Sequence, residues 1–109
     1  MLIIAVVQDQ DVNRLLAKLM EKGYSATKLA STGGFLRQGN TTLLIGVEQE
    51  SAVPEVVAVI KEVCRTRKRV VSPVATGEQA LSTYIPTPVE VEVGGATVFT
   101  IKVESLEKI

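Results

Sequence analysis

The chain has 109 residues, 46% hydrophobic and 22% charged, and its twelve Lys and Arg residues balance twelve Asp and Glu residues. This length predicts a single domain over residues 1–109, and zero net charge argues against binding nucleic acid or membrane through bulk electrostatics. The chain has no His and one Cys. These counts exclude a His metal site, a Ser-His or Cys-His catalytic pair, a Cys-based zinc site and an internal disulfide.

The longest apolar run, Leu2–Val7, is too short to span a bilayer. No basic segment precedes it and Gln8-Asp9-Gln10-Asp11 follows, which is a poor match to a signal peptide. We therefore expect a cytoplasmic protein.

The run Leu2–Val7 predicts a strand that is covered on both faces, because it is continuous and rich in β-branched residues. A helix follows, with Asp11 as its expected N-cap and Lys22-Gly23 as its end. Its apolar stripe is Val12, Leu15, Leu16, Leu19 and Met20.

Two strands are expected next, at Tyr24–Ser31 and Thr41–Val47, joined by a loop of three glycines at Thr32–Asn40. Ser51 then predicts the cap of a second helix, which tolerates Pro54 in its first turn. Its apolar stripe is Val53, Val56, Val57, Ile60 and Val63, and it is expected to end in the basic run Arg65, Arg67, Lys68 and Arg69.

The segment Val70–Pro88 contains three prolines and predicts a long loop of a kind that is often functional. Val89–Val93 alternates valine and glutamate, which indicates a strand with one solvated face. Gly94-Gly95 predicts a hairpin turn that returns the chain into a last strand at Ala96–Val103.

This element order predicts an α+β fold, a ferredoxin-like βαββαβ sandwich with an extra C-terminal hairpin strand. Each helix has one apolar stripe, so both helices must cover the same face of the sheet. The first and third strands carry too few polar residues for a solvated opposite face. A symmetric oligomer that buries sheet against sheet would cover that face.

No residue pattern indicates catalysis. Cys64 is expected to be a small buried hydrophobe, Asp9 and Asp11 suit the positive end of a helix, and Glu90 and Glu92 suit a solvated strand face.

The basic run invites a nucleic-acid interpretation, but cations equally suit a helix C-terminus. The chain also lacks an aromatic-rich strand on which bases could stack, since its only aromatic residues are Tyr24, Phe35, Tyr84 and Phe99.

The segment from Ser25 to Gly46 carries the strongest functional pattern. Glycines let backbone amides approach an anion, while Thr and Asn side chains can pair with a base edge. Phe35 and Leu36 place apolar groups inside this polar loop, and Arg37 adds a positive charge. The combination suits a nucleotide, although neither common phosphate-binding glycine motif is present. Composition alone does not decide between this site and a loop whose Phe35 fills an oligomer contact.

Three segments together resemble the PII-like cyclic di-AMP receptor proteins. They are the stretch from Ala26 to Val47, which contains Ser-Thr-Gly-Gly-Phe-Leu-Arg-Gln-Gly-Asn-Thr-Thr, the run Val7-Gln-Asp-Gln-Asp11, and the stretch from Tyr84 to Phe99. The resemblance implies a homotrimer of ferredoxin-like subunits that acts as a non-enzymatic signalling receptor in the bacterial cytoplasm. It implies cyclic di-AMP bound in clefts between subunits, with no further cofactor or metal, and a downstream protein partner that stays unidentified.

The resemblance also assigns roles to residues. Thr27 and Asn40 match polar contacts to adenine, and Gly46 matches a position where backbone groups meet the base. The segment Gly34, Phe35 and Leu36 matches the pocket lining. Ser25, Ala26 and Arg37 belong to the same expected site.

Some relatives carry a basic residue where this chain has Ser25. Loss of a charge-assisted bond of about 1.5–3 kcal/mol would weaken binding roughly tenfold to a hundredfold, unless Arg37 supplies the charge. The chain lacks the phosphate loop that PII proteins carry after the second helix, so an ATP-sensing PII-type regulator is the lesser alternative. A structural or adaptor trimer is the other.

Overall fold

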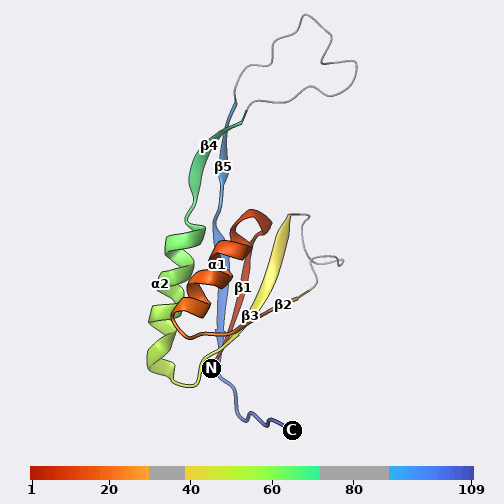
Figure 1. Ribbon diagram of the computed structural model, residues 1–109, viewed down its shortest axis with the longest axis vertical. Helices are drawn as coiled ribbons and strands as arrows, with labels where there is room; N and C mark the ends of the chain where they lie inside the picture. Colours follow the sequence, from red (N-terminus) through yellow and green to blue (C-terminus); the bar gives the residue numbers. More distant parts are fainter. Residues whose placement is uncertain (30–38, 72–88) are drawn as a thin grey trace, which may run out of the picture.

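The computed structural model describes residues 1–29, 39–71 and 89–109 (Figure 1). The elements are β1 (Leu2–Gln8), α1 (Asp9–Glu21), β2 (Ala26–Lys28), β3 (Asn40–Gly46), the short 3-10 helix η1 (Glu50–Ala52), α2 (Val53–Cys64), β4 (Arg67–Val71), β5 (Val89–Val93) and β6 (Ala96–Ile101). The expected loops Thr32–Asn40 and Val70–Pro88 lie mostly outside the described residues.

The main sheet has four antiparallel strands in the order β2-β3-β1-β6. β1 lies between β3 and β6 because its apolar, β-branched sequence suits a strand with partners on both edges. Its register with β3 runs from Leu2 opposite Gly46 to Gln8 opposite Asn40. Both helices lie on the same side of this sheet, so the α+β class and the shared helix face are confirmed (Figure 1).

The core lies between the helices and one face of the sheet. β1 and β3 alternate in burial, so that Ile3, Ala5, Leu43 and Ile45 are fully buried while their neighbours are only half-buried. The helices contribute Val12, Leu15, Leu19, Val56, Val59, Ile60, Val63 and Cys64. Met20 was expected in this stripe, but it is 75% exposed because it lies at the edge of the apolar arc of α1.

The starts of both helices differ from expectation. α1 begins at Asp9 with Gln8 as its N-cap, and Asp11 lies inside the first turn, where it is buried against Arg67 rather than capping. The predicted end is confirmed, because Lys22 is the C-cap and Gly23 has φ +87°. α2 is capped by Ala52 instead of Ser51, since η1 precedes it, and Pro54 occupies its first turn as expected.

The predicted C-terminal hairpin is wrong. β5 pairs with β4 in a separate two-stranded sheet, whereas β6 pairs with β1. Gly94 and Gly95 both have positive φ, but they lead the chain from one sheet into the other. Two non-local pairings override the local turn signal. β6 pairs with the edge of β1, and β5 pairs with β4, which contains part of the basic run.

The basic run also differs from expectation. α2 ends at Cys64, and Arg67, Lys68 and Arg69 begin β4. We call the pair β4–β5 the arm. In Figure 1 it extends away from the helices and the four-stranded sheet. Glu90 and Val91 are both exposed, so β5 has no covered face of the kind that its alternation predicted.

Candidate ligand-binding site

Part of the predicted site lies in the described structure, namely Ser25, Ala26, Thr27, Asn40 and Gly46. The other predicted residues, Gly34, Phe35, Leu36 and Arg37, lie outside the described residues. The structure therefore describes the predicted site only at β2 and at the two ends of β3.

Three of these residues share the sheet face opposite the helices, which we call the open face. Thr27 lies opposite Leu44, while Asn40 begins β3 and Gly46 ends it. Residues two apart on a strand, and directly opposite residues of paired strands, point to the same face. Ala26 instead packs against the core, so it can offer a ligand only its backbone groups.

These residues form a row along the open face rather than a single cluster. Thr27 lies about 7 Å from Gly46 and about 14 Å from Asn40 along the strand direction, at about 3.4 Å per residue. Thr27 and Gly46 thus lie nearer to each other than either lies to Asn40, which is at the other end of β3. The row suits an extended ligand.

None of the described residues requires glycine at position 46. A Cβ built at this position would meet no atom within 4 Å, and Gly46 is not among the glycines with positive φ. By contrast, Gly94 has φ +89°, and a Cβ there would clash with the carbonyl oxygen of Arg65. Any steric requirement for glycine at position 46 must therefore come from outside the described chain.

The centre of the open face is apolar. Ile4 lies between Leu44 on β3 and Phe99 on β6, and Leu2 lies opposite Ile101. Phe99 is 52% exposed and Ile101 is 44% exposed. Apolar side chains exposed together in this way mark a contact surface more often than a solvated face.

The start of β3 is held by the turn that joins β1 to α1. The backbone N–H of Asp9 donates to the carbonyl of Gly39 at 2.8 Å, and the hydroxyl of Thr41 donates to Asp9 Oδ1. Asn40, between these two contacts, lies opposite Gln8 in the β1–β3 register. The residue predicted to recognise a base is thus fixed on both sides by one aspartate.

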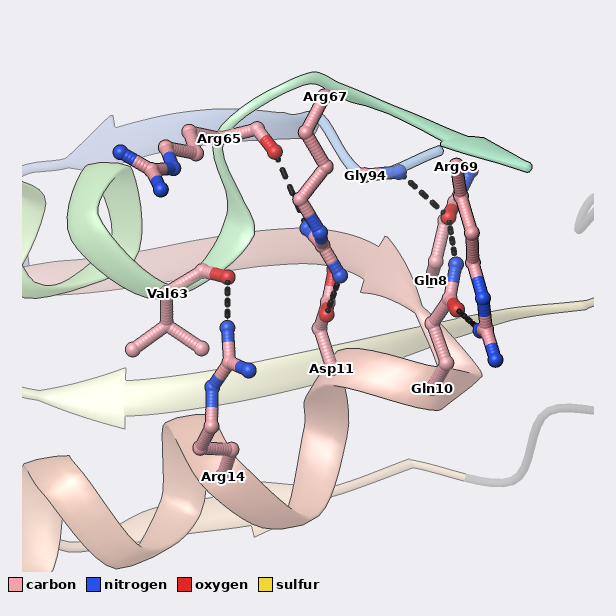
Figure 2. Close-up of polar contacts among 9 residues, drawn as sticks. All are labelled: Gln8, Gln10, Asp11, Arg14, Val63, Arg65, Arg67, Arg69 and Gly94. Atoms are coloured by element: carbon pink, nitrogen blue, oxygen red, sulfur yellow. Dashed lines mark hydrogen bonds and ion pairs between the residues drawn. The ribbon is translucent and has the colours of Figure 1, made fainter. Parts of the chain in front are cut away.

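The same turn also holds the base of the arm (Figure 2). Arg67 Nη2 lies 2.7 Å from Asp11 Oδ1, and Asp11 is only 1% exposed. The hydrogen bond from Arg67 to Asp11 raises the pKa of the guanidinium, so Arg67 stays charged at any ordinary pH. The backbone N–H of Gly94 donates to Gln8 Oε1 at 2.7 Å.

Sequence reasoning missed this junction. The cluster Gln8-Asp9-Gln10-Asp11 and the basic run were both visible, but the contacts between them join residues 56 and 59 positions apart in the chain. Opposite charges in the two segments were the one available signal. That signal does not say which residues pair.

The junction also bears on the nucleic-acid interpretation of the basic run. Arg67 is paired with Asp11, and Arg69 Nη1 lies 3.3 Å from Gln10 Oε1. These contacts direct both side chains toward α1. Arg67 and Arg69 of the run therefore hold the base of the arm to α1.

Other chemistry finds little support in the described part of the chain. Burial raises the pKa of the Cys64 thiol to about 11, so that Cys64 is a neutral thiol at pH 7. In residues 1–29, 39–71 and 89–109, no three His, Cys, Asp or Glu side chains are grouped as metal ligands. None of the helices found there is long and apolar enough to cross a bilayer.

The geometry describes a small α+β domain with one helix-covered sheet face and one open face that carries Thr27 and Asn40 beside an apolar centre. The family model of the cyclic-di-AMP receptor matches residues 1–109, and the chain belongs to this family. The family resemblance is thereby confirmed.

Among solved structures, the chain is similar to the crystal structure of a protein from Pediococcus pentosaceus that is described as functionally unknown. The two chains are 41% identical with a TM-score of 0.78, and the match covers 99% of this chain and 95% of the other. The similarity supports the α+β architecture over nearly the whole length.

Proposed function

We propose that this protein is a trimeric receptor of ferredoxin-like, PII-like subunits, each a single domain, that binds cyclic di-AMP between neighbouring subunits. Membership of the cyclic-di-AMP receptor family supports the ligand. The observation that carries the location is the open face, where Thr27, Asn40 and Gly46 lie on the same side of the sheet as exposed Phe99.

The apolar centre of the open face supports the trimer. Leu2, Ile4 and Leu44 are half-buried within one chain, and the β6 partners of Leu2 and Ile4, which are Ile101 and Phe99, are exposed. Packing this centre against the same surface of other subunits contributes about 25 cal/mol of favourable free energy for each Å² of apolar area buried. A closed ring of identical subunits leaves no copy of the face in water.

The row lies beside this apolar centre, with Thr27 level with Leu44 and Ile4, Gly46 opposite Leu2, and Asn40 at the far end of β3. Thr27 and Asn40 offer donors and acceptors for adenine, and Gly46 leaves room for a base that a side chain would occupy. Gly34, Phe35, Leu36 and Arg37 would complete the wall and supply the positive charge. Ser25, exposed just before β2, would add a hydrogen bond but no charge.

The proposed role is signalling without catalysis in the bacterial cytoplasm. Two adenines and two phosphates call for two base contacts and dispersed anion contacts, and neither needs an acid, a base or a nucleophile. We propose that ligand binding orders the segments Thr32–Asn40 and Val70–Pro88 and so changes the surface shown to a downstream protein.

A thermal-shift panel with cyclic di-AMP, ATP and cyclic di-GMP tests this function, alongside the mass of the particle in solution. We expect a trimer that only cyclic di-AMP stabilises, by RT ln(1 + [L]/Kd). Stabilisation by ATP alone would support the PII-type regulator. A trimer that no nucleotide stabilises would support a structural or adaptor role, and a monomer in dilute solution would remove the site between subunits.

Substitution of Phe35 tests whether the loop binds the ligand or forms a contact between subunits. Phe35→Ala should weaken cyclic di-AMP binding while the trimer stays intact. Monomers that keep normal affinity per chain would instead show that Phe35 serves the subunit contact.

A further inference from the structure

The arm is attached to the rest of the described molecule at one place. Among the described strands, β4 and β5 pair only with each other, and their base meets the end of α2 and the start of α1 (Figures 1 and 2). A two-stranded ribbon is marginally stable by itself. Its direction therefore depends on the contacts at its base.

These contacts are specific rather than merely adjacent. Arg67 reaches Asp11 with both terminal nitrogens, at 2.7 and 3.5 Å, and the same guanidinium donates to the carbonyl of Arg65 at 3.1 Å. Gly95 N–H donates to the carbonyl of Cys64, which ties the return strand to the end of α2. Removing one partner of a buried pair leaves an uncompensated charge, so this geometry is strongly preferred.

We define residues Gln8–Asp11 as the joint. These residues contact the start of β3 on one side and the base of the arm on the other. On one side Asp9 holds Gly39 and Thr41, and Gln8 lies opposite Asn40. On the other side Gln8 accepts from Gly94 and Asp11 holds Arg67. Since these four residues form the last residue of β1 and the first turn of α1, one side cannot rotate without disturbing the other.

We propose that this joint couples Asn40 to the arm, with Asp9 positioning Asn40 while Gln8 and Asp11 position the arm. The coupling itself is a property of the fold. Its use as a signal rests on the proposed function, because it requires that Asn40 contact the ligand. By thermodynamic linkage, a ligand that favours one setting of Asn40 favours one setting of the arm, and a change in the arm alters affinity to the same degree.

A reciprocal exchange experiment on the full chain without ligand tests the coupling. Arg67→Gln perturbs the arm side, and amide hydrogen exchange by NMR is read at residues 39–41. Thr41→Val perturbs the other side, and exchange is read at Gly94 and Gly95. Each change should speed exchange across the joint about fivefold or more, the lower range of typical coupling.

Matched controls separate coupling from general loosening. Lys68→Gln removes a charge from the same strand and should leave exchange at residues 39–41 unchanged, whereas Arg67→Lys and Thr41→Ser should restore most of the protection. The amide of Ile60 in α2 should exchange as in the unaltered chain. If each perturbation speeds exchange only on its own side, the joint does not couple the two regions. Should Arg67→Gln fail to fold, Thr41→Val decides the question, with exchange read at Gly94 and Gly95 and Thr41→Ser as its control.

Addition of cyclic di-AMP distinguishes this inference from the proposed function. In the unaltered protein, ligand should slow exchange at Glu90–Val93, and Arg67→Gln should abolish that response and weaken binding about fivefold or more. A protein that binds cyclic di-AMP without changing exchange in the arm would overturn the joint as a signal path and leave the receptor standing. Absence of any binding would overturn the receptor, while the ligand-free exchange still decides the coupling.

Discussion

The two faces of the four-stranded sheet are built from alternate residues of the same strands, yet they end in different environments. On β3, Leu43 is fully buried beneath the helices, and its neighbour Leu44 is half-buried on the open face. Both are leucines, so hydrophobicity does not explain the difference. One face is completed by the chain itself, and the other has an apolar surface that a single chain leaves partly exposed.

The largest expected effect comes from comparing these adjacent leucines. Leu43→Ala should lower the free energy of unfolding by about 2–5 kcal/mol, because it leaves a cavity in a closed core. Leu44→Ala should cost less than half of that in the separated subunit. Thermal unfolding over a range of protein concentrations measures both. The Leu44→Ala loss should depend on concentration, since it acts through association, and equal, concentration-independent losses would contradict the difference between the faces.

The second prediction concerns association through the open face. Phe99→Ser should weaken assembly by about 1.5–3 kcal/mol per subunit, the value of burying one large apolar side chain. Analytical ultracentrifugation measures the shift toward monomer. Met20→Ser is the control, since Met20 is more exposed than Phe99 but lies on α1. If both substitutions leave the particle mass unchanged, the subunits do not meet through this face.

The third prediction concerns the polar end of the open face. Asn40→Ala should reduce the affinity for cyclic di-AMP by about 1–3 kcal/mol, because it would leave a buried base edge without its partner. Titration calorimetry measures the loss. Asn13→Ala, at an exposed position of α1, should bind normally. Full affinity in Asn40→Ala would remove Asn40 from the site.

The fourth prediction separates a glycine that the chain needs from one that a ligand would need. Gly46→Ala should raise stability by about 0.5–1 kcal/mol, since an extended glycine is entropically unfavourable, and should weaken binding of cyclic di-AMP. Gly23→Ala, at φ +87°, should do the reverse, with a stability loss of about 1–2 kcal/mol and normal binding. Thermal unfolding and calorimetry on both variants make the comparison. Normal binding in Gly46→Ala would show that no base lies against this position.

The last prediction concerns Cys64 under the helix-covered face. Burial raises the pKa of the folded thiol to about 11, so the folded state holds this proton more tightly than the unfolded state does. The resulting stability is fully present below the unfolded pKa and is lost as pH rises toward 11. Between pH 9 and 11, the free energy of unfolding should therefore fall less in Cys64→Ala than in the unaltered chain. Thermal unfolding at several pH values measures the difference. Parallel pH profiles would mean that the thiol is not buried as described.

Much of the local structure could be predicted from the sequence. Continuous β-branched runs predicted β1 and β3, helical spacing predicted α1 and α2, and Lys22-Gly23 predicted the end of α1. The scarcity of polar residues on alternate positions of β1 and β3 also indicated the open face. These signals succeed because burial and backbone preference act on neighbours within one element.

What the tertiary structure decided are the pairings between distant segments. Gly94-Gly95 has the composition of a tight hairpin turn, but β5 pairs with β4 and β6 with β1. Asp11 is a residue type that often caps helices, but it is buried and pairs with Arg67, which is 56 residues away in the chain. A local motif indicates which conformations one segment tolerates. The free energy of the whole chain determines which strands and charges pair, and no single segment contains that information.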